Sequence, residues 1–440
     1  MTLNLRNIGL FALMALLLIA TGVLQSWSVA LLLLNMSLIS AIMALGVNIQ
    51  WGYAGLFNVG VMGFAALGGL AGVLVSTLPV AAAWSAGGSN ILLALLAVLA
   101  TIALTVFVNV QFKRNILFRG FATALVLIAG FIATRYFFDP GVEAIEAVDS
   151  ARTGYLGGLG LPIILSWIVG GFLAAGAAWV VGKISLGLRS DYLAIATLGI
   201  SEIIVAMLKN EDWLTRGVKN VSGLPRPVPY EINLQRSEWF QDLSASLDVS
   251  VVDFSSIFVK LCYTGLFAAV LLIILWFSER ALNSPWGRMM RAIRDNEDAA
   301  NAMGKAVTAR HLQVFILGSA VIGIAGAMLT TLDGQFTPAS YQPLRFTFLI
   351  WVMVIVGGSG NNWGAVLGGF VIWFFWIQAE PLGLWFMDLI TSGMADDSPL
   401  RAHLIKNAAH TRLMTMGLVL LLVLRFTPRG LIPERGGRSP

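Results

Sequence analysis

The sequence predicts an all-α polytopic membrane protein in which about 10–12 helices cross the bilayer. Hydrophobic residues make up 58% of the 440 residues and charged residues only 12%, whereas charged residues approach about a quarter of a soluble domain. Apolar runs such as Ile8–Leu24 and Ile91–Val110 have the roughly 17–25 residues that a helix needs to cross the hydrocarbon core. Runs of this length exclude a barrel of about ten-residue alternating strands.

The predicted spans follow the apolar runs along a single transmembrane domain, residues 1–440. They lie near residues 8–24, 27–48, 55–78, 91–110, 116–136, 161–181, 190–209, 258–278, 312–331, 344–360, 364–380 and 411–426. The first run is a retained helix and not a cleaved secretory signal, because further spans follow at once. The runs at 344–360 and 364–380 are short and are joined by GGSGNNWG, so they form either two crossings or a re-entrant loop.

The basic residues predict the orientation of the chain. With a cytoplasmic C-terminal tail, strict alternation places the other basic segments on the same side. These segments contain Arg6; Lys113, Arg114 and Arg119; Lys183 and Arg189; the loop 279–311; and Arg425, Arg429, Arg435 and Arg438 of the tail. Both termini are then cytoplasmic, and orientation rather than nucleic-acid binding explains the net charge of +5. The opposite, periplasmic face receives the acidic linker Asp139–Ser150, the segment 210–257 and the connection 394–410.

The window WGYAGLFNVGVMGFAALGGLAG, Trp51–Gly72, is rich in glycine. One interpretation is a tight helix contact, because small residues at a spacing near four let helix backbones approach closely. The other is a broken helix at Gly52, Gly55, Asn58 and Gly60 that lines a path for a solute.

An ionisable residue lies deep in the predicted span SDYLAIATLGISEIIVAMLK, Ser190–Lys209. Glu202 is about 18 Å along a helix that rises 1.5 Å per residue. A carboxylate at that depth usually faces a protein interior or a wet cavity and marks a transport path; the alternative is a structural partner on a neighbouring helix. Gly199 would break the helix just before it. The density of Pro and Gly in Trp213–Pro229 excludes a long helix, leaving a loop that contacts a partner or only connects two spans.

The stretch GRMMRAIRDNEDAANAMG, Gly287–Gly304, concentrates charge in the loop 279–311. Its composition predicts one helix that ends before Gly304, with i, i+4 pairs between Arg291 and Asp295 and between Arg294 and Asp298. An exposed helix of mixed charge is typical of a docking surface for a soluble partner, and the alternative is a solvated helix that only follows the positive-inside rule. The candidate coupling residues are Arg291, Arg294, Glu297, Asp298, Ala299, Ala300 and Gly304.

Several segments carry a resemblance to a known family. The stretch RAIRDNEDAANAMGKAVTARHLQVFILGSAVIGIAGAML resembles the cytoplasmic loop and following helix of permease subunits from the ABC importers of branched-chain amino acids. Glu297, Ala299, Ala300 and Gly304 stand at the E-A-A…G coupling motif, with Asp298 inserted after the Glu. GYAGLFNVGVMGF, SDYLAIATLGISEII, LTRGVKNVSGLPRP and LRFTPRGLI are similar to further family segments in the family's order. Residues 80–161, with two additional spans, depart from the family.

The resemblance implies a permease of type II-like architecture in a bacterial inner membrane. It would pair with a second permease, two cytoplasmic ATP-binding subunits and a periplasmic binding protein that delivers Leu, Ile or Val. ATP and Mg would be bound by the partner subunits and no cofactor by this chain, and no G-x-x-x-x-G-K-[ST] occurs in the sequence. Two alternatives are a permease for urea, short amides or another amino acid, and an ion-coupled secondary transporter with Glu202 as its ion site. His311, His403, His410 and Cys262 form no evident metal or nucleophile constellation, so neither a metal site nor an enzyme is expected.

Overall fold

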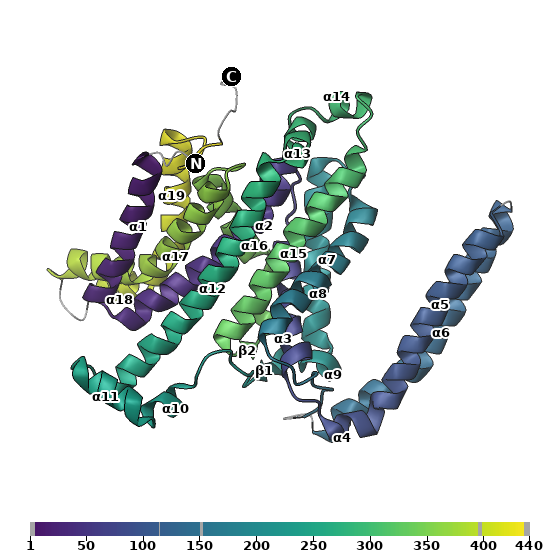
Figure 1. The fold of residues 1–440 in the computed structure, drawn as a ribbon, viewed down its shortest axis with the longest axis horizontal. Helices are drawn as coiled ribbons and strands as arrows, with labels where there is room; N and C mark the ends of the chain where they lie inside the picture. The colour runs from purple at the N-terminus through teal and green to yellow at the C-terminus, as the bar shows by residue number, and fades with distance from the viewer. Residues whose placement is uncertain (1–4, 114, 150–152, 395–397, 435–440) are drawn as a thin grey trace.

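The computed structural model describes the chain apart from residues 1–4, 114, 150–152, 395–397 and 435–440, and it is built almost entirely of α-helices (Figure 1). Within that described part, nine helices are long and apolar enough to cross a membrane, and the bent pair α18–α19 adds a tenth if it forms one span. Two further apolar helices, α3 and α16, are shorter. Each of the twelve predicted spans contains a helix, so the all-α fold class is confirmed. Arg114, Arg435, Arg438 and Ser150, used in the orientation argument, lie outside the described residues.

The long helices are α1 (Leu5–Leu24), α2 (Trp27–Ala54), α5 (Ser89–Gln111), α6 (Ile116–Val148), α7 (Ile164–Ser185), α8 (Ser190–Asn210), α12 (Val251–Asn283), α15 (Val307–Asp333) and α17 (Asn362–Thr391). The shorter helices are α3 (Val61–Ser76), α4 (Ala81–Ala83), η1 (Trp84–Gly88), α9 (Asp212–Thr215), η2 (Gly217–Lys219), α10 (Glu231–Gln235), α11 (Glu238–Ser246), α13 (Pro285–Asp295), α14 (Glu297–Ala302), η3 (Pro338–Ser340), α16 (Pro343–Gly357), α18 (Pro399–Lys406), η4 (Ala408–His410) and α19 (Thr411–Phe426). The two strands are β1 (Val221–Ser222) and β2 (Gln335–Phe336).

Helix α2 lies at the centre of the main bundle, because it is apolar on nearly all sides and 78% of its most apolar window is buried. It packs against α15, α17 and α12, while α3 packs against α15 and α7. Glycine makes the contacts of α3 close: a Cβ at Gly68 would lie 2.7 Å from the Gly323 carbonyl carbon on α15, and one at Gly63 would lie 2.8 Å from Ser201 Cα on α8. The tight-contact interpretation of the glycine-rich window therefore agrees with the structure.

A layer of short elements closes the end of the bundle that lies opposite α13 and α14 (Figure 1). Strands β1 and β2 pair antiparallel, with Val221 opposite Phe336 and Ser222 opposite Gln335. They tie the segment 210–257 to the connection between α15 and α16. The stretch 213–229 holds only α9, η2 and β1, which confirms that it forms no long helix.

The pair of helices α5 and α6 forms a hairpin that stands apart from the main bundle and meets it at the end near α9 (Figure 1). The contact includes the rings of Phe138 and Trp213, whose centroids are 5.5 Å apart. Residues 139–148 were predicted as an acidic linker, but α6 continues through Pro140 to Val148. In this stretch Arg135 and Asp139 form an i, i+4 ion pair of 2.7 Å, and Gly141 packs closely on η1.

Helices α16 and α17 pack against each other. Helix α16 begins beside β2, and its C-terminal end is bound by the tail, because Leu431 N donates to Val356 O at 2.8 Å. The turn at residues 358–361 then reverses the chain into α17. By length, α17 with 30 residues is a candidate membrane span and α16 with 15 is not, and the alternatives of two crossings and a re-entrant loop both stand.

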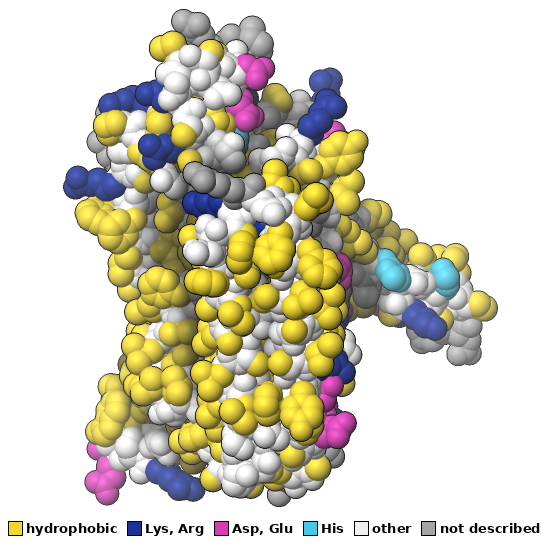
Figure 2. Space-filling model, turned by 90° about the vertical axis from the view of Figure 1, so that its right-hand side faces the viewer, with side chains coloured by type: hydrophobic (Ala, Val, Ile, Leu, Met, Phe, Trp, Pro, Cys, Tyr) yellow, Lys and Arg dark blue, Asp and Glu magenta, His cyan; other side chains and the backbone are white. Residues whose placement is uncertain are grey.

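The two ends of the molecule differ in the segments that they carry. The start of α1 and the described C-terminal segment up to Glu434 lie at the end with α13 and α14, and β1, β2, α10 and α11 lie at the other end (Figure 1). Figure 2 shows hydrophobic side chains over the middle of one face, with charged side chains gathered toward the two ends. This distribution suits a protein that crosses a bilayer.

Candidate functional site

The helix predicted to be broken near Gly52–Gly60 is broken in the structure. Helix α2 ends at Ala54, Gly55 adopts the left-handed φ of 70°, and α3 begins at Val61. The non-helical residues 55–60 pass close to α8, where a Cβ at Gly60 would lie 2.7 Å from the Thr197 carbonyl oxygen. The break therefore depends on one left-handed residue and one close backbone approach, and glycine suits both.

Buried side chains hold this loop in place. Asn58 Nδ2 donates to Gln50 Oε1 at 2.8 Å, and Asn58 Oδ1 accepts from Gly60 N at 2.8 Å. Trp351 Nε1 donates to the Asn58 carbonyl at 3.0 Å. Gly52, Asn58 and Gly60 are buried, so they lie in packed interior, and their role in a solute path stays a prediction.

A second set of buried amides was missed by sequence reasoning. Asn48 Nδ2 donates to Asn362 Oδ1 at 3.1 Å, and Asn362 Nδ2 donates to Glu279 Oε1 at 3.0 Å. Gln50 Nε2 donates to Ser319 Oγ at 3.0 Å. The available signal was two amides, Asn48 and Gln50, in an otherwise apolar span, because such groups usually bond across helices.

Glu202 lies on an outward surface of α8, which corrects the expectation that it faces the interior of this chain. Gly199, Glu202 and Ile203 are exposed, whereas Ser201 and Val205 on the other face are buried. Helix α8 is continuous, so Gly199 does not break it, because a single glycine costs only about 1 kcal/mol in a helix. A carboxylate at this depth is costly in lipid, so this face needs polar cover from outside the described residues.

The predicted single helix Gly287–Met303 is instead two helices, α13 and α14. Asn296 separates them with φ −157° and caps α14, because its Oδ1 accepts from Ala299 N at 2.9 Å. Asn favours this N-cap position over a helix interior, which is why the helix restarts here. The predicted stop is confirmed: Gly304 follows α14 with a φ of 76°.

The coupling candidates divide into two groups. Those in α14 are largely outward: Glu297, Asp298 and Ala299 are exposed, and Ala300 is buried. Arg291 and Arg294 in α13 contact the C-terminal segment instead, and both are only partly exposed. The docking surface stays a prediction, and within it Arg291 and Arg294 also bind the C-terminal segment.

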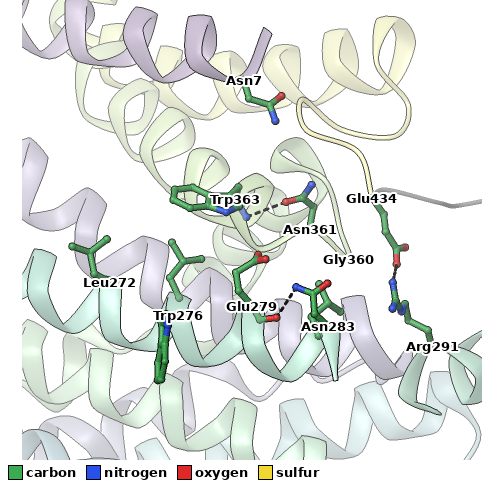
Figure 3. A pocket seen from close by; sticks show the side chains of 12 residues that line it. Asn7, Leu272, Trp276, Glu279, Asn283, Arg291, Gly360, Asn361, Trp363 and Glu434 are labelled. Carbon is green, nitrogen blue, oxygen red and sulfur yellow. Dashed lines mark hydrogen bonds and ion pairs between the residues drawn. The ribbon is translucent and has the colours of Figure 1, made fainter. Parts of the chain in front are cut away.

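Glu434 in the C-terminal segment binds both of these arginines. Arg294 Nη1 lies 3.0 Å from Glu434 Oε2. Arg291 Nη1 lies 3.9 Å from Glu434 Oε1 (Figure 3). The predicted i, i+4 pairs are replaced, because Arg294 Nε contacts the neighbouring Asp295 at 3.2 Å rather than Asp298. The sequence did not predict this contact, because Glu434 follows the last span and is far from α13 along the chain.

Arg294 also connects α13 to the helix break. Its Nη1 donates to the carbonyl oxygen of Gly52 at 2.5 Å, and a Cβ at Gly55 would lie 3.3 Å from Arg294 Cγ. The turn at Gly360 closes the same cluster, because Gly360 N donates to Asn48 Oδ1 at 2.8 Å. A displacement of α13 would therefore be transmitted directly to the end of α2.

A cavity of about 760 Å³ lies beside this cluster. Trp276 and Glu279 of α12, Arg291 of α13, Asn361 and Glu434 contribute to its walls (Figure 3). Helix α13 is held against the bundle by its buried apolar face, with Met290 and Ile293 in the core, and the contacts of Glu434 add to this packing.

Comparisons with known proteins agree on one family. The family model for the permease component of the branched-chain amino acid transport system matches residues 114–424. The high-affinity branched-chain amino acid transport system permease protein LivM of Salmonella typhimurium is 29% identical over 235 residues, which are 53% of this chain and 54% of that protein. This chain thus spans about half the length of that relative.

Two further relatives come from other organisms. The probable branched-chain amino acid transport permease protein LivM of Methanocaldococcus jannaschii is 28% identical over 285 residues, which are 64% of this chain and 70% of that protein. The xylose transport system permease protein XylH of Haemophilus influenzae is 24% identical over 284 residues, which are 62% of this chain and 64% of that protein. No solved structure matches the chain.

Proposed function

Because this chain belongs to the family of branched-chain amino acid transport system permease components, we propose that it is the membrane subunit of an ATP-driven, binding-protein-dependent importer of Leu, Ile and Val in a bacterial inner membrane. The names of the two LivM relatives support the solute class. The observation that carries the transport mechanism is the bond from Arg294 to Gly52, which joins the exposed loop helices to a broken membrane helix. The chain transforms nothing chemically and holds no cofactor of its own.

The proposed mechanism is alternating access driven from the cytoplasmic end. Two ATP-binding subunits dock on the cytoplasmic loops of the two permeases, in this chain on α14, whose exposed Glu297, Asp298 and Ala299 face a soluble partner. Their closure moves α13, and Arg294 passes that movement to the end of α2 and to the loop 55–60. A binding protein delivers the solute at the opposite end, where α9, α10 and α11 form the surface.

A second permease covers the outward face of α8 in this proposal. Glu202 requires a polar neighbour or water at its depth in the span, and an interface with another subunit supplies either one. The solute path then lies between the two permeases. The ion-coupled alternative would use the exposed Glu202 as an ion site, and the dependence of uptake on ATP or on an ion gradient distinguishes the two.

Reconstitution tests the proposal. The chain is assembled in proteoliposomes with the candidate permease, ATPases and binding protein encoded beside it, and uptake of labelled leucine is followed. The expected result is uptake that requires both ATP and the binding protein and that persists after an ionophore collapses the ion gradients. Uptake that follows an ion gradient without ATP would establish the secondary-transporter alternative, and uptake of urea or short amides in place of leucine would correct the solute.

A further inference from the structure

A second cavity, of about 170 Å³, lies inside this chain between α2, α15, α16 and α17. Its lining runs from Asp333, at the C-terminal end of α15, to Met62, in the first turn of α3. Met62 directly follows the helix break, so the cavity extends from the end that carries β1 and β2 toward the loop 55–60. The volume suits a small solute, since a cavity of roughly 150 Å³ in another protein admits benzene, a molecule of six heavy atoms.

The walls of this cavity are apolar and adaptable. Met43, Met62 and Met353 contribute thioethers from three different helices, and Ile350 adds a branched side chain. Methionine fills irregular space and accommodates ligands of varied shape. A pocket with such walls suits an unbranched or branched aliphatic group rather than a polyhydroxylated one, which would need many more hydrogen-bond partners.

The lining also carries polar groups, which are Ser40 on α2, Asp333 on α15, Ser340, Tyr341 and the indole of Trp373 on α17. Asp333 lines the cavity and is solvent-accessible, and no described residue donates a hydrogen bond or forms an ion pair with its carboxylate. Tyr341 lies beside it with its hydroxyl bonded to Thr330 Oγ1 at 2.9 Å, and burial raises the pKa of Tyr341, which keeps that hydroxyl neutral. The carboxylate is therefore free to accept from a cationic ligand.

A positive charge lies one side chain away. The Arg345 guanidinium carbon is 5.6 Å from the ring centroid of Phe346, which lines the cavity, and 5.0 Å from that of Trp376. The cavity thus has a carboxylate in its wall and a guanidinium behind a lining ring. The carboxylate in the wall is complementary to an ammonium group, whereas the exposed Arg345 guanidinium lies outside the lining.

We propose that this cavity is a transit site for an aliphatic α-amino acid, with its ammonium group on Asp333 and its side chain among Met43, Met62 and Met353. The inference rests on the proposed function. It adds that this chain recognises the solute at a site of its own, in addition to the solute path between the two permeases. It also predicts discrimination by charge: a ligand without the ammonium group loses its contact with Asp333.

The test measures equilibrium binding of labelled leucine to the assembled permease–ATPase complex in nanodiscs, without the binding protein. Two variants target the cavity: Asp333→Asn removes the charge, and Ser340→Trp fills space at a lining residue that is exposed. Their matched controls are Asp242→Asn, an exposed carboxylate on α11, and Ala339→Trp, the exposed neighbour of Ser340. Each cavity variant should weaken leucine binding about tenfold or more, and the controls should bind like the wild type.

A second readout reports the chemistry of the contact. The wild type should prefer leucine to 4-methylpentanoate, the analogue that lacks the amino group, and Asp333→Asn should abolish that preference. Absence of leucine binding by the wild type, or wild-type affinity in either cavity variant, overturns the inference. ATP- and binding-protein-dependent leucine uptake by the wild type is measured in parallel, so a failure of the transit site is distinguished from a failure of the proposed function.

Discussion

Arg294 and Glu434 form an ion pair of 3.0 Å that attaches the loop helix α13 to the C-terminal segment. Both side chains are largely shielded from solvent, with exposed fractions of 23% and 19%. The same arginine binds the Gly52 carbonyl at the end of α2. One side chain therefore joins three segments that are far apart in the sequence, and the tail becomes part of the coupling apparatus.

The first prediction concerns this ion pair. Glu434→Gln should lower the stability of the purified protein by about 1–2 kcal/mol, because a shielded charged hydrogen bond is lost. It should also lower leucine uptake per ATP hydrolysed, because α13 is held less firmly to the end of α2. The measurements are the thermal unfolding of the complex and the ratio of uptake to hydrolysis in proteoliposomes.

Asp295→Asn is the matched control for this prediction. Asp295 contacts the same arginine at 3.2 Å, but 67% of its side chain is exposed, and exposed pairs contribute little. Equal effects of the two substitutions would mean that shielding of Glu434 is irrelevant to coupling.

The second prediction concerns orientation. In a Cys262→Ser background, Ser246→Cys on α11 should react with an impermeant thiol reagent added to intact cells, and Ala302→Cys on α14 should not. Both positions are exposed, so accessibility does not depend on packing. Labelling after permeabilisation is the control for Ala302→Cys, and its labelling in intact cells would reverse the assigned sides.

The fold was largely predictable from the sequence, and the pairing of side chains was not. Apolar runs locate helices because length and hydropathy are local properties, and Gly55 and Gly304 mark breaks because their positive φ values favour glycine. The sequence analysis predicted one helix here because the composition favours a helix throughout. Asn296 instead caps a second helix, which separates α14 from α13. The contact of Glu434 with Arg294 depends on how remote segments pack, which no local pattern encodes.

The third prediction concerns Glu202, which is exposed on α8. Glu202→Leu should leave insertion of this chain intact and reduce leucine uptake about tenfold or more, as expected when a polar group on a path or subunit interface is lost. Uptake and co-purification of the second permease are measured together. Ile203→Leu, on the same exposed face, is the control, and normal uptake by Glu202→Leu would show that its carboxylate is incidental.

The fourth prediction concerns the turn after the docking helix. Gly304 has a φ of 76°, and a Cβ built there meets no atom within 4 Å, so any effect of substitution arises from backbone strain rather than from a clash. A β-branched residue resists this conformation, and its strain costs about 1–3 kcal/mol. Asn tolerates it far better. Gly304→Val should therefore insert in the membrane but lose uptake, while Gly304→Asn retains most of it.

The expected order of the Gly304 variants depends on the direction in which α14 faces the ATPase. A strained turn changes the path from α14 back to α15, which begins at Val307, and so displaces Glu297 and Asp298 from the ATPase. Pull-down of the ATPase, and stimulation of its activity by loaded binding protein, should decrease in the order wild type, Gly304→Asn, Gly304→Ala and Gly304→Val. Glu297→Lys should decrease both as much as Gly304→Val, because it reverses a charge on α14 without altering the turn. If Gly304→Val and Glu297→Lys both associate and transport normally, α14 is a solvated loop helix and ATP hydrolysis is coupled elsewhere.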